Sequence, residues 1–220
     1  MTTSLEALNR LQDIGIGYCV SQTLVAACKL GLFEELSNGP LTAEDLSQRL
    51  RIDPLACRRR LMALKQLELV ERENEHYRNS ELGAFCTSKS PVNLAALAGA
   101  GDLFYHMFEF LSDAVREGSP RWEQALGASS ADVFGALYAD PARLRQFAEL
   151  MNAMSIPEGQ EIAARFDFTP HQCVMDVAGG PGGMAVQIGL RHRHLRGIIM
   201  DMAPVCRVAE EYIEASGLER

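Results

Sequence analysis

The sequence has few features that would place the protein in a membrane or in an oxidising compartment. No apolar run approaches the roughly 20 residues that a membrane-spanning helix needs, and the start of the chain has no signal-peptide pattern. The six cysteines form no C-x-x-C pair and no metal-ligand spacing with a histidine. We therefore expect a soluble cytoplasmic protein with free thiols, no bound metal and no membrane partner.

Clustered basic charge is also scarce. The chain has 21 Lys and Arg against 29 Asp and Glu, a net charge of -8, whereas a nucleic-acid surface needs concentrated positive charge. One run, Arg58 to Arg60, leaves a DNA-binding regulator as a less favoured alternative. Residues 41–90 as a whole hold nine basic and eight acidic side chains, so we expect no nucleic-acid partner.

The first part of the chain predicts helices. Apolar residues recur at helical spacing between Leu5 and Leu36. Glycine is costly inside a helix, so we expect a break near Gly15 and Gly17 and an end near Gly31. The apolar residues at the end of this helix, Leu30, Leu32 and Phe33, either pack inward or meet a second copy of the chain. Together with the apolar stretch over 94–115, this excess predicts a dimer.

A winged-helix pattern follows. Thr42 with Asp45 three residues later resembles a capping box, and Asp53 before Pro54 is a strong helix start. Residues 70–79 then predict a β-hairpin. Asp140 and Pro141 repeat the helix-start signal, and the chain remains mainly helical to about residue 166.

The character of the sequence changes after that point. An apolar strand over residues 173–177 leads into a glycine-rich turn and a helix over 185–190. A second strand over 198–200 ends at Asp201, and a helix over 205–213 follows. This β-α-β-α order is the opening of a doubly wound parallel sheet.

The glycine turn predicts a nucleoside-bearing cofactor. Glycines let a ligand approach the backbone, and the helix behind them presents free N–H groups. Asp201, about 20 positions after the turn, is placed to hold two ribose hydroxyls. Asp176 directly before the turn would disfavour a pyrophosphate and suits an ammonium group, so S-adenosylmethionine fits better than a dinucleotide.

The chain resembles a known family along essentially its whole length. The segments that carry the resemblance are SQTLVAACKLGLFEEL, LTAEDLSQRL, RRRLMALKQLELVER, DPARLRQFAELMNAMS, VMDVAGGPGG and GIIMDMAPV. They are similar to blocks of the S-adenosylmethionine-dependent small-molecule O-methyltransferases, which join a winged-helix dimerisation domain to a Rossmann-like methyltransferase domain. The resemblance implies a mainly α dimerisation and substrate-pocket domain over 1–165, and the first β-α-β-α of an α/β cofactor-binding domain over 166–220. It also implies a homodimer.

Site residues follow from the same resemblance. Gly179, Gly180 and Gly182 would line the methionine part of the cofactor. Asp201 would bind the ribose and Met202 would border the adenine. In the family's F-x-x-x-M-x-x-x-S helix, Ser155 would face the cofactor and Met151 the substrate.

The implied reaction is methyl transfer to a hydroxyl of a small, aromatic acceptor. Two departures stand out: Ala178 replaces the usual glycine, and none of the five histidines matches the family's catalytic base, so no catalytic residue is assigned. The family continues beyond the segments matched here. We therefore expect a further C-terminal half, or a second chain, to complete the sheet, and a non-methylating or structural relative stays an alternative.

Overall fold

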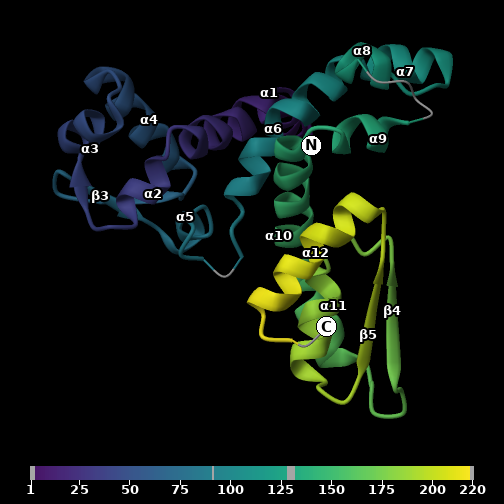
Figure 1. Ribbon diagram of the computed structural model, residues 1–220. Coiled ribbons are helices and arrows are strands. Elements are labelled where there is room, and N and C mark those ends of the chain that lie inside the picture. The colour runs from purple at the N-terminus through teal and green to yellow at the C-terminus, as the bar shows by residue number, and fades with distance from the viewer. Residues whose placement is uncertain (1–2, 91, 128–131, 219–220) are drawn as a thin grey trace. The chain divides into compact units, whose positions relative to one another are not determined.

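The computed structural model describes residues 3–90, 92–127 and 132–218 (Figure 1). It divides into two compact units, residues 1–101 and 102–220. The boundary that the sequence predicts near residue 165 does not coincide with this division. It separates the expected dimerisation part from the expected cofactor-binding part of the chain, and it stays a prediction.

Helix α1 runs without interruption from Thr3 to Lys29, so the predicted break near Gly15 and Gly17 is wrong. Each glycine costs a helix only about 1 kcal/mol, and a Cβ atom added at either position would meet nothing within 4 Å outside the helix's own backbone, so no close contact requires glycine there. The end near Gly31 is confirmed, because Gly31 adopts the left-handed conformation with a φ of 73° before α2 (Leu32–Leu36) begins.

The rest of the first unit has the predicted helix–turn–helix–hairpin order. Its elements are β1 (Leu41–Thr42), α3 (Ala43–Leu50), α4 (Pro54–Gln66), β2 (Val70–Glu73), β3 (His76–Asn79) and α5 (Glu81–Ala84). The Thr42 hydroxyl accepts a hydrogen bond from the Asp45 amide at 3.1 Å, and the Asp53 carboxylate accepts one from the Ala56 amide at 2.7 Å. Both predicted caps are therefore confirmed, and the strands pair antiparallel in the order β1-β3-β2.

The core of this unit gathers apolar side chains from α1, α2, α3, α4 and the hairpin. Its buried members are Ala27, Leu32, Phe33, Leu36, Leu46, Cys57, Leu61, Leu64, Leu69, Val70, Tyr77 and Cys86. The first two thirds of α1 contribute nothing to it. Large apolar side chains there remain exposed: Leu5, Leu8, Leu11, Ile14, Ile16, Tyr18 and Val20.

The second unit combines helices with a two-stranded parallel sheet. Its elements are most of α6 (Ala95–Glu109), then α7 (Leu111–Glu117), α8 (Trp122–Leu126), α9 (Val133–Tyr138), α10 (Pro141–Arg165), β4 (Cys173–Val177), α11 (Gly183–Arg191), β5 (Arg196–Met200) and α12 (Ala203–Ala215). Asp140 caps α10 by accepting from the Ala142 amide at 2.8 Å, as predicted. Strands β4 and β5 are parallel, with Cys173 opposite Arg196 and Val177 opposite Met200.

Helices α10 and α11 pack closely because one side chain is missing between them. Gly159 is buried in α10, and a Cβ atom there would lie 2.7 Å from Cα of Met184 in α11. The same interface joins the side chains of Gln160 and Gln187 by a hydrogen bond of 3.2 Å. Since α11 follows directly on the glycine-rich turn, this packing positions the turn.

One face of the sheet is open. In Figure 1, α10, α11 and α12 lie to one side of β4 and β5, and Val174 and Ile199 are partly covered there. On the other face Met175, Val177 and Met200 are 54%, 61% and 50% exposed. Parallel sheets normally carry cover on both faces, so this face is an apolar surface without a partner among the described residues.

No helix within the described ranges is long and apolar enough to cross a membrane. The same residues contain no group of histidine, cysteine and acidic side chains arranged to hold a metal ion.

Candidate functional site

The turn between β4 and α11 is built from residues in the left-handed conformation. Ala178, Gly180 and Gly182 have φ values of 57°, 58° and 88°. The Ala178 amide donates to the carbonyl of Met200 at 2.8 Å, which fastens the turn to the end of β5. Gly182 is buried and is the cap residue of α11. The backbone therefore doubles back at the carboxyl edge of the sheet, where α/β proteins bind their ligands.

Asp201 joins the end of β5 to this turn. One carboxylate oxygen accepts a hydrogen bond from the Gly180 amide at 2.8 Å, and the other accepts from the Met202 amide at 2.7 Å. Such charge-assisted bonds are stronger than neutral ones. The structure thus brings together Gly180, Asp201 and Met202, three of the residues that the sequence predicts for a cofactor site.

Asp176 supplies a second carboxylate from the neighbouring strand. Its side chain lies against Gly179, because a Cβ atom on Gly179 would be 2.7 Å from Cγ of Asp176. Partial burial, and after it the negative charge of Asp201, raise the pKa of Asp176 above its ordinary value. The edge of the sheet is therefore an acidic site that favours a cationic group.

This arrangement predicts a pH-dependent stability cost. The pKa of Asp176 is about 3.9 in the unfolded chain and is raised in the folded state. Ionising Asp176 therefore destabilises the fold, and the loss grows as pH rises from the unfolded-state pKa to the folded-state pKa. Asp176→Asn removes that cost, so we expect the variant to melt at a higher temperature than the original chain at pH 7. Thermal melts at several pH values should show this difference shrinking to nothing under acid conditions. A difference that is constant across pH would contradict the assigned cause.

Helix α10 places two further side chains beside the glycine turn. A Cβ atom on Gly180 would lie 4.0 Å from Cβ of Met151, and a Cβ atom on Gly183 would collide with the hydroxyl of Ser155. Met151 and Ser155 are one helical turn apart and both are partly buried. The two residues that the sequence assigns to this helix therefore both lie beside the glycine turn.

Sequence reasoning missed Tyr138, the last residue of α9. Burial, and after it the charge of Asp201, raise the pKa of the Tyr138 phenol, which places this side chain near the same carboxylate. The ring packs against the buried cluster of Leu144, Ala148, Val205 and Val208. The sequence gives little indication of this role. Tyr138 stands two residues before the helix cap Asp140, and no motif connects it with Asp201.

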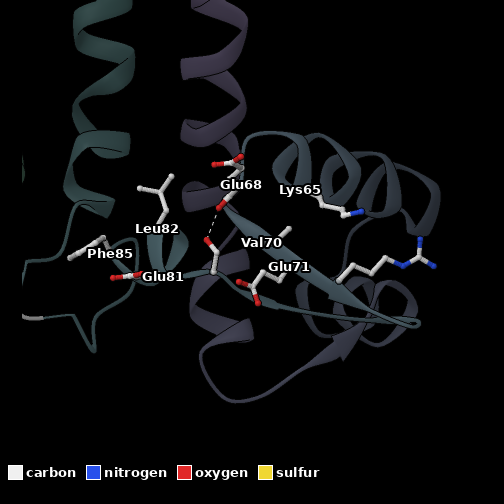
Figure 2. A pocket seen from close by; sticks show the side chains of 9 residues that line it. Lys65, Glu68, Val70, Glu71, Glu81, Leu82 and Phe85 are labelled. Carbon is white, nitrogen blue, oxygen red and sulfur yellow. Dashed lines mark hydrogen bonds between the residues drawn. The ribbon is translucent and has the colours of Figure 1, made fainter.

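A groove of about 770 Å³ lies in the other unit (Figure 2). It is lined by Lys65, Glu68, Val70, Glu71, Arg72, Ser80, Glu81, Leu82 and Phe85. The Ser80 hydroxyl donates to the carbonyl of Glu68 at 2.6 Å on its wall. It is wide open and mixed in charge, and none of the predicted cofactor residues lines it.

Comparisons with known proteins match both parts of the chain. The O-methyltransferase domain family matches residues 108–220, and the O-methyltransferase dimerisation domain family matches residues 13–89. Among curated proteins, N,N-dimethyltransferase OxyT of Streptomyces rimosus is 32% identical over 95% of this chain and 61% of its own length. Acetylserotonin O-methyltransferase of Gallus gallus is 31% identical over 89% of this chain and 59% of its own length.

Solved structures give the same result. Human N-acetylserotonin methyltransferase in complex with S-adenosylmethionine superposes with a TM-score of 0.86, at 26% identity over 96% of this chain and 64% of that one. CalO1, a methyltransferase of calicheamicin biosynthesis bound to S-adenosylhomocysteine, superposes with a TM-score of 0.76, at 26% identity over 93% of this chain and 61% of that one. The chain therefore belongs to the O-methyltransferase family. It spans about three fifths of the length of the curated relatives it matches.

Proposed function

We propose that this protein transfers a methyl group from S-adenosylmethionine to a hydroxyl group of a small aromatic acceptor. The observation that carries the proposal is the pair of hydrogen bonds by which Asp201 joins the glycine turn to the start of α12, in a chain of the O-methyltransferase family. A relative among the curated proteins is a 3-hydroxy-5-methyl-1-naphthoate 3-O-methyltransferase, whose name fits this class of acceptor.

The residues present fit the cofactor. Gly179, Gly180 and Gly182 open the backbone of the turn to a ligand, and the left-handed φ of Gly180 and Gly182 favours glycine at both positions. Asp201 would hold the ribose hydroxyls, and the exposed Met202 would lie against the adenine.

The remaining contacts come from the neighbouring elements. Asp176 would attract the ammonium end of the cofactor, because its partly buried carboxyl group lies at the same edge of the sheet as the acidic Asp201. Ser155 and Tyr138 would complete the cofactor site from α10 and α9, and Met151 would border the acceptor. Most of the proposed cofactor contacts therefore lie within residues 166–220, the segment that the sequence predicts for cofactor binding, and α9 and α10 add Tyr138 and Ser155 to them.

When bound, S-adenosylmethionine supplies an electrophilic methyl group on a sulfonium sulfur. The residues of this chain orient that group and shield it, which is the main requirement for an in-line transfer. No side chain of the described residues is assigned as the base that deprotonates the acceptor.

The β-α-β-α segment is the opening of a larger Rossmann-like sheet in this proposal. The support is the open apolar face, where Met175, Val177 and Met200 are half exposed or more. Further strands and helices, from the same polypeptide or a second one, cover this face and pair with the free edges of β4 and β5.

The functional unit in this proposal is a homodimer. The support is the match to the dimerisation domain over residues 13–89 and the exposed apolar side chains between Leu5 and Val20. A second copy is the partner that buries this surface.

The DNA-binding alternative is not favoured. Arg58, Arg59 and Arg60 lie on α4, and the segment that holds them matches a methyltransferase dimerisation domain.

The direct test is transfer of an isotope-labelled methyl group. The protein, assembled with the strands that complete its sheet, should pass label from S-adenosylmethionine to phenolic acceptors. The Gly180→Val variant should not, because a β-branched residue is strained at a φ of 58°. Amine acceptors belong in the same panel, since one relative is an N,N-dimethyltransferase. If label reaches only amines, the acceptor group is an amine and not a hydroxyl. If S-adenosylmethionine binds and no label is transferred, the protein is a non-methylating relative.

A further inference from the structure

Helix α4 concentrates positive charge on an otherwise acidic chain. Its 13 residues include Arg58, Arg59, Arg60 and Lys65, and none of them is acidic. The whole chain, by contrast, has a net charge of -8. Arg58, Arg59 and Lys65 are exposed, and Arg60 is partly buried. The outer face of α4 is therefore a basic surface within a chain that repels other acidic molecules.

The basic side chains of α4 take no part in holding the fold together. Exposed arginines elsewhere are paired, as Arg145 is with Glu211, whose carboxylate oxygen lies 2.7 Å from the guanidinium group. The side chains of residues 58–60 and of Lys65 form no ion pair and no hydrogen bond within the ranges that the structure describes. Their charges are therefore available to a partner.

Apolar side chains and a groove accompany this charge. Leu55 and Met62 are 54% and 58% exposed on the same helix. A groove of about 400 Å³ adjoins them, and it is lined by Asp53, Leu55, Ala56, Arg59, Arg60 and Ala63. The two alanines are small and share one helix face with Arg59 and Arg60, so they leave room between the longer side chains. This mixture of apolar and charged groups suits a protein partner.

The inner face of α4 is fixed by the core of the first unit. Cys57, Leu61 and Leu64 are fully buried there, and α4 packs against α1, α3 and β2 (Figure 1). The Asp53 carboxylate caps the start of the helix. The outer face is thus presented on a rigid element, which lowers the entropy cost of binding.

We propose that the outer face of α4 is a docking site for an acidic, amphipathic helix of a partner protein. Carboxylates of that helix pair with Arg58 and Arg59, whose planar guanidinium groups bind carboxylates in a bidentate manner. Its apolar side chains lie against Leu55 and Met62 and enter the adjoining groove. Charge complementarity directs the helix to this face, because the chain as a whole is acidic. The site is separate from the glycine turn and does not depend on methyl transfer.

A nucleic acid fits this face less well. Its phosphate backbone has little apolar surface to cover Leu55 and Met62, and the Asp53 carboxylate in the groove repels phosphates. Residues 41–90 hold nine basic and eight acidic side chains, so the positive charge does not extend far beyond α4. A phosphate backbone needs a longer basic track.

The test is fluorescence anisotropy with labelled acidic peptides that form a helix of about four turns. Each peptide carries glutamates one turn apart, with leucine or phenylalanine between them on the same face. The assembled protein should bind these peptides roughly tenfold more tightly than peptides of the same composition in scrambled order, because only the ordered helix places both kinds of group on one face. Rising salt should weaken the binding.

Variants locate the site. Arg58→Glu combined with Arg59→Glu should weaken the binding roughly tenfold or more, since like charges then face each other. Met62→Gln keeps the charge and should weaken it by a smaller factor. Arg116→Glu is the matched control: it reverses an exposed arginine of α7 in the other unit and should leave the affinity within about twofold.

Three results would overturn the proposal. The first is equal binding of ordered and scrambled peptides, or no binding of either. The second is a DNA duplex that binds more tightly than the peptides and loses affinity in the double arginine variant, which would make the face a nucleic-acid site. The third is a change in the sedimentation of the double variant from dimer to monomer, which would make the face a contact between copies. The ordered and scrambled peptides are compared on the original protein, so the first result does not depend on whether the variants fold.

Discussion

Asp201→Ala should weaken the binding of S-adenosylmethionine at least tenfold. The change removes the carboxylate that accepts from the Gly180 and Met202 amides and that would hold the ribose hydroxyls. Hydrogen bonds to a charged group contribute roughly 1.5–3 kcal/mol each, and a loss of about 1.4 kcal/mol corresponds to a factor of ten. Isothermal calorimetry on the assembled protein measures the effect directly.

Two further variants test whether binding needs the negative charge of Asp201, and whether the loss of another carboxylate has the same effect. Asp201→Asn keeps one oxygen acceptor and should fall between the alanine variant and the original chain. Asp167→Ala removes an exposed carboxylate that accepts from the Thr169 amide in the segment before β4, away from the glycine turn, and should leave the affinity unchanged. If the affinity of Asp201→Ala for S-adenosylmethionine stays within twofold of that of the original chain, Asp201 does not bind the ribose.

Gly159→Val should damage both folding and binding. A side chain at this buried position would press on the backbone of Met184, with Cβ 2.7 Å from its Cα and 3.0 Å from its carbonyl oxygen. Backbone atoms cannot move aside as a side chain can, so α10 and α11 must separate. Overpacking of this kind costs about 1–3 kcal/mol, which corresponds to a fall in melting temperature of roughly 2–12 °C for a chain of this size. The glycine turn leads into α11, so the affinity for S-adenosylmethionine should fall as well.

Gly197→Val is the matched control, because a Cβ atom at that position in β5 meets nothing within 4 Å. Thermal melts of the two valine variants should therefore differ by several degrees, with the residue 159 variant the less stable. Equal melting temperatures would mean that α10 and α11 do not pack as closely as their glycine contact implies.

Local chemistry explains what the sequence predicted well. The caps at Thr42, Asp53 and Asp140 depend on residues two or three positions away, and all three form the expected hydrogen bonds. Strand β4 coincides with the predicted apolar run over 173–177. The glycine turn and Asp201 were placed at one edge because parallel strands end at the same side of a sheet.

Tertiary context explains what the sequence did not predict. The glycines of α1 were expected to break the helix, but propensity is a weak prior that flanking residues override. The proximity of Tyr138 to Asp201 depends on how α9 and α10 fold back onto α12, which no local spacing encodes.

The role of the glycine turn as the S-adenosylmethionine site is tested most directly by nuclear magnetic resonance. The amide signals of the assembled, isotope-labelled protein are followed while S-adenosylmethionine is added. We predict that the signals of Gly179, Gly180, Gly182 and Met202 shift together and saturate with one binding constant. Saturating shifts confined to other residues, such as those lining the groove between Lys65 and Phe85, would contradict the account, as would the absence of any shift.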